Sequence, residues 1–175
     1  MISLLLRQPP FFKDVLRLFD VDYKRALERI VQIKKNRDKT MGSTYRTQIT
    51  VRFRDLDAMG HVNNAVFFTY FEIGREAFWF DKVSGHVDKT RSYFILARIS
   101  CDFMRPISFG TQLTLTLAVK NIGSKSFGYL YKLSDSVDES IEYARGESVQ
   151  VCYDYSQNKS VAISPEFRAI LLEFC

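Results

Sequence analysis

Apolar and polar side chains alternate along three runs in the second half of the chain, at residues 113–119, 127–133 and 149–153. A period of two predicts a strand with one buried face, so we expect three strands there. Turn-forming residues at 121–124 and 135–140 separate the runs. Consecutive strands joined by short turns favour an antiparallel meander over a parallel sheet with crossover helices.

An earlier strand and a long helix precede these runs. Ile49, Val51 and Phe53 alternate with polar residues up to position 54, which predicts a half-buried strand. From residue 66 to residue 80, apolar and aromatic side chains occur nearly all round a helix, as expected where a sheet buries it on most sides. Gly74 in the middle allows a close backbone approach, at a cost of about 1 kcal/mol in helix propensity.

Between this strand and this helix, residues 55–64 combine two carboxylates, a turn glycine, a histidine and two asparagines. Asn63 is expected to cap the helix through its side-chain oxygen. The backbone N–H groups of the first turn, including that of Asn64, then stay free to bind a ligand. This loop is the expected site of chemistry.

The start of a helix favours negative charge, because it carries about half a positive elementary charge and unpaired N–H groups. A carbonyl oxygen placed there is polarised, and an oxyanion formed there is stabilised. Asp57 is the natural nucleophile or general base beside those donors. An ionised carboxylate is an adequate attacker of an activated acyl group such as a thioester, whose thiol leaves readily.

Residues in and after this loop also carry a resemblance. In the stretch 51–75 they are Arg52, Asp55, Asp57, Gly60, His61, Val62, Asn63, Asn64, Glu72 and Arg75. Later matches are Arg105, Pro106, Gly110, Lys125, Ser126, Phe127, Ser164, Pro165 and Glu166. Together they resemble the 4-hydroxybenzoyl-CoA thioesterase family of hotdog-fold acyl-CoA hydrolases, over about residues 45–172 of the chain.

The resemblance implies an α+β hotdog fold, in which an antiparallel sheet of about five strands wraps a long central helix. It implies a homodimer or homotetramer with the site at the subunit interface. The implied reaction is hydrolysis of an acyl-CoA thioester in the cytoplasm. Coenzyme A is then part of the substrate, and no separate cofactor or metal is expected.

Roles carry over from the family by position. Asp57 takes the place of the catalytic aspartate, which either attacks the thioester to give a mixed anhydride or activates water. Asn64 takes the position whose backbone N–H binds the thioester oxygen, and His61 and Asn63 stand in supporting positions. Lys125 stands at the family's phosphate-side lysine. Arg145 is a second candidate for the phosphates of coenzyme A, which need basic side chains.

Several other interpretations of these residues stay open at this point. Asp55, Asp57 and His61 can be metal ligands, although a single histidine is a weak set. Asn63 and Asn64 can simply start a helix, and His61 can be structural. Glu72 lies where another thioesterase branch keeps its catalytic carboxylate, although pairing with Arg75 at the next turn or across an interface is the simpler expectation.

Other functions also remain possible: a non-catalytic module that binds acyl-CoA or acyl-carrier protein, an acyl-carrier-protein thioesterase, and a hotdog dehydratase or hydratase. No phosphate-cradling glycine loop supports nucleotide hydrolysis. The cysteines, Cys101, Cys152 and Cys175, have no paired ligand spacing and are expected to be reduced thiols.

The charge distribution separates the chain into two parts. Residues 1–40 hold 10 Lys and Arg against 5 Asp and Glu, and residues 41–175 hold 15 of each kind, so the net charge of +5 belongs to the leading segment. A neutral domain does not indicate a nucleic-acid binder, which needs surplus basic residues. No apolar run is long enough to span a bilayer.

Residues 1–40 are expected to form a basic N-terminal extension, and residues 41–175 the hotdog thioesterase domain. Apolar residues at roughly helical spacing between 15 and 30 predict a basic amphipathic helix in the extension. It resembles neither a secretory signal nor a mitochondrial one. Met41 offers an alternative, in which residues 1–40 lie upstream of the true start.

Overall fold

The computed structural model describes residues 43–87 and 93–175. The strands in these ranges are β1 (Tyr45–Thr50), β2 (Tyr93–Phe103), β3 (Gln112–Lys120), β4 (Ser126–Asp135), β5 (Glu142–Asp154) and β6 (Lys159–Ser160). The helices are α4 (Asn64–Phe78) and α5 (Pro165–Glu173), with a 3-10 turn, η1 (Phe53–Asp55), and a π-helical turn, η2 (Trp79–Val83). The predicted N-terminal extension lies outside the described residues, and the division into an extension and a domain stays a prediction.

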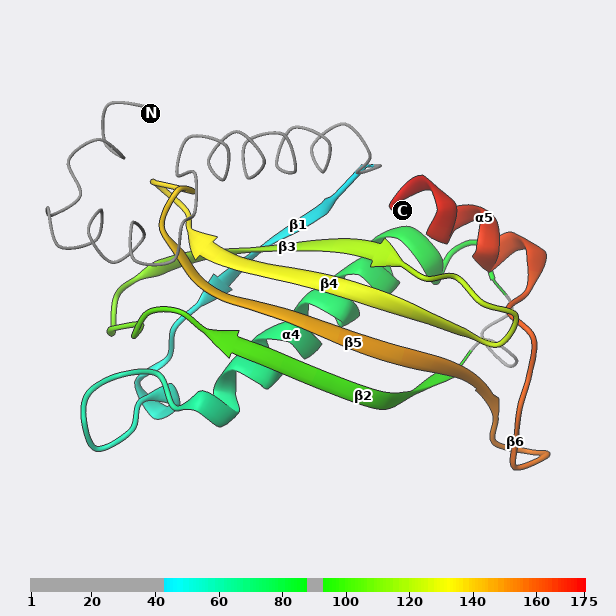
Figure 1. The fold of residues 1–175 in the computed structure, drawn as a ribbon, viewed down its shortest axis with the longest axis horizontal. Helices are drawn as coiled ribbons and strands as arrows, with labels where there is room; N and C mark the ends of the chain where they lie inside the picture. Colours follow the sequence, from blue (N-terminus) through cyan, green and yellow to red (C-terminus); the bar gives the residue numbers. More distant parts are fainter. Residues whose placement is uncertain (1–42, 88–92) are drawn as a thin grey trace, which may run out of the picture. The chain divides into compact units, whose positions relative to one another are not determined.

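One antiparallel sheet organises the described residues, with strand order β1-β3-β4-β5-β2 and the short β6 paired with the end of β5. Figure 1 shows α4 lying across one face of this curved sheet, while α5 lies near the C-terminus. The expected hotdog fold, a long helix wrapped by an antiparallel sheet of about five strands, is therefore confirmed. In the described part of the chain, no helix is long and apolar enough to cross a bilayer.

The core lies between α4 and the sheet. The alternation predicted at 113–119 and 127–133 is confirmed, because the apolar residues of β3 and β4 are buried: Leu113, Leu115, Leu117, Val119, Phe127, Tyr129, Tyr131 and Leu133. Phe71 of α4 stacks on Tyr131 with ring centroids 4.5 Å apart. Burial of side chains of this size typically stabilises a fold by about 1.5–3 kcal/mol each, so this layer holds the helix on the sheet.

Gly74 lies where α4 comes closest to the sheet. A Cβ atom at this position would be 2.1 Å from Cδ2 of Leu115 on β3. The close approach expected from the sequence is therefore present, and it sets the depth of the helix in the sheet. α4 still leaves one stripe of residues exposed, with Glu72 and Glu76 among them.

Two details of the predicted strands are wrong. β1 ends at Thr50, and Phe53 is 80% exposed instead of continuing a half-buried strand. The chain turns because the backbone N–H of Arg52 donates to the Asp55 carboxylate and the Asp55 N–H donates to the Arg52 carbonyl, each at 2.9 Å. These bonds close the 3-10 turn that starts the loop.

In β5 the buried face is the less apolar one. Val149 and Val151 are only half-buried, whereas Ala144, Ser148 and Gln150 are buried. The Phe71 ring lies against Gly146, in the middle of this buried face. Small residues are therefore needed on β5 where α4 packs against it. The alternation of apolar residues at 149–153 predicted the opposite face of β5 to be buried, and that prediction is wrong.

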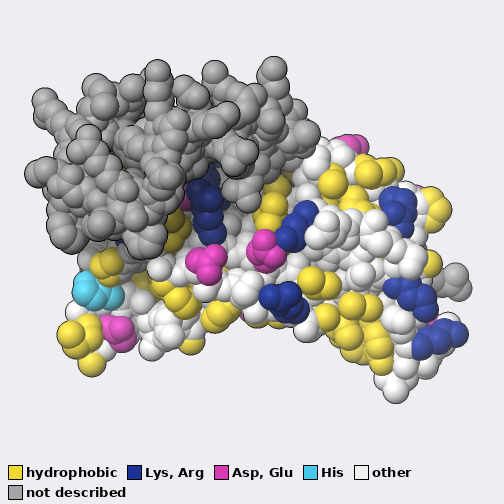
Figure 2. Space-filling view, viewed as in Figure 1, with side chains coloured by type: hydrophobic (Ala, Val, Ile, Leu, Met, Phe, Trp, Pro, Cys, Tyr) yellow, Lys and Arg dark blue, Asp and Glu magenta, His cyan; other side chains and the backbone are white. Residues whose placement is uncertain are grey.

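Charged side chains are mixed on the face of the domain visible in Figure 2, where Lys and Arg alternate with Asp and Glu and with apolar patches. Among the described residues, Lys120 Nζ forms an ion pair with the Glu147 carboxylate at 2.6 Å. This mixture agrees with the equal numbers of acidic and basic residues in residues 41–175.

Candidate active site

The loop before α4 is a tight hairpin. Leu56 pairs with Val62, the Asp57 N–H donates to the His61 carbonyl at 2.8 Å, and the Gly60 N–H donates to the Asp57 carbonyl at 3.1 Å. Gly60 has a φ of +79°, a conformation that three-residue hairpin loops require after their first turn and that glycine adopts without strain. The turn glycine predicted from the sequence therefore shapes the loop.

Asp57 is exposed within this hairpin, and its own loop orients its carboxylate. The Asp57 Oδ1 atom accepts hydrogen bonds from the backbone N–H of Met59 at 2.8 Å and of His61 at 3.3 Å. No described residue donates a hydrogen bond to Oδ2 of Asp57. One oxygen is therefore fixed, and the other is free to meet a substrate or a water molecule.

Asp55 is the opposite case, because only 3% of it is exposed. Its carboxylate accepts hydrogen bonds from the Arg52 N–H at 2.9 Å, the Arg52 guanidinium at 3.2 Å and the Tyr70 hydroxyl at 3.0 Å. Burial alone would raise the pKa of Asp55, but these hydrogen bonds and the charge of Arg52 lower it below the ordinary value. Asp55 thus fastens the loop to α4 and has no free oxygen to offer a metal.

The start of α4 follows directly after the hairpin. Asn63 has φ −59° and ψ 137°, and its side-chain oxygen accepts a hydrogen bond from the Ala65 N–H at 2.9 Å, which confirms the predicted cap. The Asn63 N–H donates to the Asp55 carbonyl at 2.9 Å. Asn64 is the first helical residue, and no described residue accepts a hydrogen bond from its N–H. A helix start with an unused donor can bind a carbonyl oxygen or an oxyanion.

His61 lies half-buried between this hairpin and the segment before β3. It forms a bridge with Ser108, and the next residue, Val62, donates its N–H to the Ile107 carbonyl at 2.8 Å. Within the described ranges, no side chain or backbone group forms a hydrogen bond with the imidazole. The structure therefore brings Asp57, His61, Asn63 and Asn64 together in one hairpin and helix start.

The two candidate phosphate ligands are not part of this group. Lys125 Nζ donates to the Ser160 carbonyl at 3.2 Å, and Arg145 pairs with Glu142 at 2.6 Å. Arg145 of β5 pairs with Lys132 of β4. Lys132 follows Lys125 by seven residues, which corresponds to about 23 Å along a strand, so Arg145 and Lys125 lie far apart. The hairpin that carries Asp57 pairs with the segment just before β3, whereas Lys125 follows the end of β3. The nine residues of β3 span about 30 Å, which separates Asp57 from Lys125 along that strand. One chain does not bring these three side chains together.

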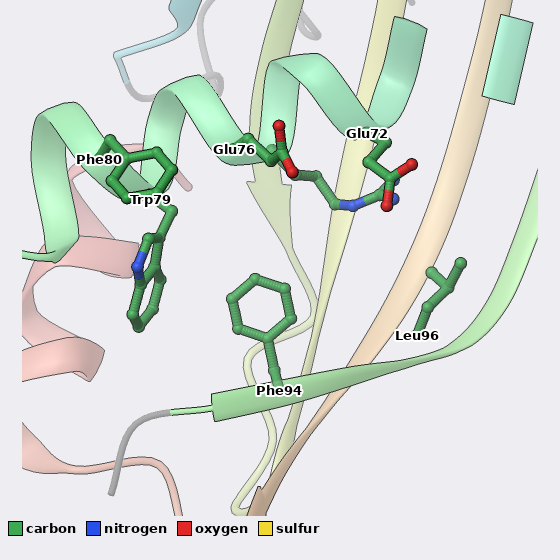
Figure 3. Close-up of a pocket in the computed structure, with 7 residues that line it drawn as sticks. Glu72, Glu76, Trp79, Phe80, Phe94 and Leu96 are labelled. Carbon is green, nitrogen blue, oxygen red and sulfur yellow. The ribbon is translucent and has the colours of Figure 1, made fainter. Parts of the chain in front are cut away.

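A cavity of about 340 Å³ opens between α4 and β2, and it is lined by Glu72, Arg75, Glu76, Trp79, Phe80, Phe94 and Leu96. Figure 3 shows Phe94 and Leu96 rising from the strand towards the helical residues Glu72, Glu76 and Trp79. Glu72 is exposed, and no ion pair joins it to Arg75 in the described part of the chain, so the pairing expected at the next turn is wrong, while pairing across an interface stays a prediction. Arg75 turns to the sheet and donates to the Tyr131 hydroxyl at 3.2 Å.

Metal-ligating side chains are dispersed in the structure. Among the residues that the structure describes, no three of the His, Cys, Asp and Glu side chains lie together as a metal site. Asp55 is enclosed by Arg52 and Tyr70, which leaves Asp57 and His61 without a third partner.

Comparison with known proteins agrees with this arrangement. The sequence profile of the thioesterase-like superfamily matches residues 51–171, which include the hairpin, α4 and the whole sheet except β1. This chain belongs to that superfamily. It is a thioester hydrolase, and the resemblance of the loop is confirmed, whereas a non-catalytic module is not supported.

Relatives within the thioesterase-like superfamily share most of the described domain. The long-chain acyl-CoA thioesterase FadM of Escherichia coli is 30% identical over 130 residues, which cover 70% of this chain and 92% of that protein. A thioesterase from Thermus thermophilus, solved with coenzyme A and zinc, is 27% identical with a TM-score of 0.60 and covers 72% of this chain and 95% of its own. The structure of a predicted thioesterase from Bacillus stearothermophilus, 23% identical with a TM-score of 0.67, shares the fold over 75% of this chain and 96% of its own.

Sequence reasoning gave no role to the groups that hold the site in place. Tyr70 and Arg52 fix Asp55, and Ile107 receives the hairpin. One signal was present for Tyr70, because a tyrosine on a buried helix face needs a partner for its hydroxyl. Nothing in the local sequence pointed to Ile107, which follows the hairpin by 45 residues.

Proposed function

We propose that this protein hydrolyses acyl-CoA thioesters to a free acid and coenzyme A. The observation that carries the proposal is the unused N–H of Asn64 at the helix start beside the exposed Asp57 carboxylate. Similarity to FadM and to a thioesterase that binds coenzyme A supports acyl-CoA as the substrate class.

In the proposed reaction, the thioester oxygen accepts a hydrogen bond from the Asn64 N–H, and the helix start stabilises the negative charge that develops on it. Asp57 then acts in one of two ways. Its free oxygen attacks the carbonyl carbon, the C–S bond breaks and a mixed anhydride forms, which water later opens. Alternatively, Asp57 takes a proton from a water molecule that attacks the same carbon, and the thiolate leaves directly. His61 is proposed to orient the carboxylate or the water, and no metal takes part.

The distance between Asp57 and Lys125 in one chain supports a site shared by two subunits. If Lys125 binds the phosphates of coenzyme A, it must come from a second copy, because it follows the far end of β3. β2 is an edge strand of 11 residues, and Leu96 and Phe103 on it are exposed by 46% and 48%. An edge of this kind favours pairing with another strand. We therefore propose a homodimer or homotetramer with the site at the interface.

The first test compares Asp57→Asn with the wild-type protein on a panel of acyl-CoA thioesters without added metal. The Asn side chain can still accept the hydrogen bonds from Met59 and His61, so the variant should fold normally and release no coenzyme A. Full turnover in Asp57→Asn would remove the carboxylate from the mechanism. Turnover only of acyl-carrier-protein thioesters would keep the chemistry and change the substrate.

The second test deletes the proposed oxyanion donor without touching a side-chain contact. Asn64 is the first residue of α4, where proline is tolerated. Asn63 already has the extended backbone that a following proline requires. Asn64→Pro should keep the fold and lower kcat by about 100- to 1,000-fold, while Asn64→Ala should stay close to wild type. Equal activity in both variants would show that this N–H does not bind the thioester oxygen.

The shared site has its own test. Asp57→Asn and Lys125→Ala are each expected to lower activity when assembled alone. Co-expression of both variants should restore activity, because mixed dimers then contain one site with both wild-type residues. No restoration in purified mixed dimers would place Asp57 and Lys125 in separate functions.

A further inference from the structure

Arg75 is a buried cation without a counter-ion. Only 8% of it is exposed, and no carboxylate of the described residues lies within ion-pair distance of it. Its guanidinium donates one hydrogen bond, to the Tyr131 hydroxyl at 3.2 Å, and lies 6.0 Å from the centre of that ring. Arginine carries five N–H donors, so most of them have no acceptor in the described structure. These nitrogen atoms are not among the enclosed unpaired polar atoms of the described residues, so they reach the cavity and can bind a ligand or water there.

The Tyr131 hydroxyl continues into a buried polar chain on the sheet. Tyr131 forms a hydrogen bond with Ser148, and the Gln150 side chain donates to the same serine oxygen at 2.8 Å. The carbonyl oxygen of the Gln150 side chain is fully buried and accepts no hydrogen bond. Burial raises the pKa of Tyr131, so its hydroxyl keeps its proton at neutral pH. The chain therefore offers unused donors at Arg75 and an unused acceptor at Gln150.

Arg75, at one end of this polar chain, borders the cavity between α4 and β2, whereas the buried Gln150 does not line it. Arg75 lines the cavity, as does Leu96 on β2. Leu96 stands directly opposite Gln150 in the β2–β5 ladder, and directly paired residues share one face of a sheet. Figure 3 shows that the other walls, Trp79, Phe80 and Phe94, are aromatic. The cavity thus combines aromatic and aliphatic walls with the charged side chains of Glu72, Arg75 and Glu76.

The position of Arg75 along α4 determines how far from the thioester the Arg75 guanidinium can contact a bound acyl chain. Arg75 follows Asn64 by eleven residues on the same helix, which is about 16 Å at the rise of an α-helix. Eleven residues are also close to three full turns, so both residues lie on nearly the same side of α4. A chain bound with its carbonyl at Asn64 reaches Arg75 only at its distal end.

The charge of the cavity decides between an anionic and a neutral group. Glu72 and Glu76 line it together with Arg75, so a second anion would meet two carboxylates beside one cation. A hydroxyl can accept a hydrogen bond from Arg75 and donate one to a carboxylate, so it meets no such repulsion. A neutral hydroxyl therefore fits better than a terminal carboxylate.

We infer that the cavity selects acyl chains that carry a hydroxyl group far from the thioester, and that Arg75 is the residue that recognises it. This inference rests on the proposed acyl-CoA hydrolysis. It makes the protein a hydrolase for distally oxygenated acyl-CoA rather than for plain saturated chains. Trp79, Phe80 and Phe94 then contact the methylene part of the chain.

The test compares four substrates of equal chain length: dodecanoyl-CoA, ω-hydroxydodecanoyl-CoA, β-hydroxydodecanoyl-CoA and dodecanedioyl-CoA. We expect the wild-type kcat/KM for the ω-hydroxy substrate to exceed that for dodecanoyl-CoA by about tenfold or more. The β-hydroxy substrate, whose oxygen lies beside the carbonyl, and the diacid should show no such gain. Arg75→Met should remove the preference. Arg98→Met makes the same chemical change at an exposed position of β2 and should leave it intact.

The ratio between two substrates separates recognition from damage to the fold, because a structural defect lowers both values together. A wild-type preference for the plain chain, an equal gain from the β-hydroxy group, or a preference that survives in Arg75→Met would each overturn the inference. If Arg75→Met does not fold, the wild-type ratios alone still decide. If no CoA thioester is hydrolysed at all, the proposed function fails. Turnover without ω-hydroxy preference refutes only the role of Arg75.

Discussion

Asp55 and Asp57 are two residues apart, and the structure assigns them opposite tasks. Replacing Asp55 by Asn keeps the size of the side chain but removes its charge. The Asp55 carboxylate accepts hydrogen bonds from the Arg52 backbone and guanidinium and from the Tyr70 hydroxyl, at 2.9–3.2 Å. An amide keeps one acceptor oxygen and turns an N–H₂ group towards the remaining donors. We therefore expect Asp55→Asn to destabilise the fold.

The size of this effect follows from those contacts. Hydrogen bonds to charged groups contribute about 1.5–3 kcal/mol each and do not add fully when they share one acceptor. A loss of about 3 kcal/mol in the free energy of unfolding at pH 7 is expected for Asp55→Asn. For a chain of this length that corresponds to a fall in Tm of about 6–12 °C. Asp57→Asn is the matched control and should lose turnover without losing stability.

The pH dependence gives an independent check. The folded-state pKa of Asp55 lies below its ordinary value of 3.8, so its contribution is fully present above that value. It is lost as the pH falls through the lowered folded-state pKa. Asn does not titrate, and the stability gap between wild type and Asp55→Asn should therefore narrow below about pH 4.

Urea unfolding at fixed protein concentration, from pH 7 down to pH 3, measures both quantities. Tyr70→Phe and the double variant complete a cycle, in which the double variant should lose less than the sum of the single losses. A gap of less than about 0.5 kcal/mol at pH 7, which is typical of surface substitutions, would refute the structural role of Asp55. A gap that stays constant on acidification would refute the assigned pKa.

Two further predictions concern the cap and the thiols. Asn63→Ala should cost about 1 kcal/mol in the free energy of unfolding because the Ala65 N–H loses its acceptor, and Asn63→Ser should restore most of it. Equal stability of the two variants in urea would contradict the capping role. Burial raises the pKa of the Cys101 and Cys152 thiols to about 11, so at pH 7 iodoacetamide should label the exposed Cys175 first. Peptide mass mapping that finds Cys101 or Cys152 modified before Cys175 would contradict this.

Local patterns were reliable where one residue or one period decides the structure. The alternation at 113–119 and 127–133 marked the buried faces of β3 and β4 correctly, because these apolar residues belong to one buried core. Asn63 and Gly60 acted as the sequence indicated, since a cap and a left-handed turn depend only on neighbouring residues. The resemblance of residues 51–75 placed the candidate site on the correct loop.

Contacts between distant segments were not readable in the same way. Hydrophobicity pointed to the wrong face of β5, because the Phe71 ring needs small residues opposite it. Helical spacing predicted an ion pair between Glu72 and Arg75 within the chain. Arg75 instead donates a hydrogen bond to the hydroxyl of Tyr131, 56 residues away in the sequence. Lys125 and Arg145 both suited a phosphate, yet the sheet register sets them far apart.

The sequence by itself determined the local elements, the cap, the turn and the family, because these depend on side chains within a few positions of each other. Only the tertiary structure decided which carboxylate is free. Asp55 and Asp57 look alike in the sequence, but Tyr70, one turn and a half into α4, reaches the first and leaves the second exposed. It also decided that Arg75 faces a cavity and forms no ion pair with a carboxylate of the described residues. Packing of a helix on a sheet joins groups that no short window of sequence contains, and the chemistry of the site depends on those groups.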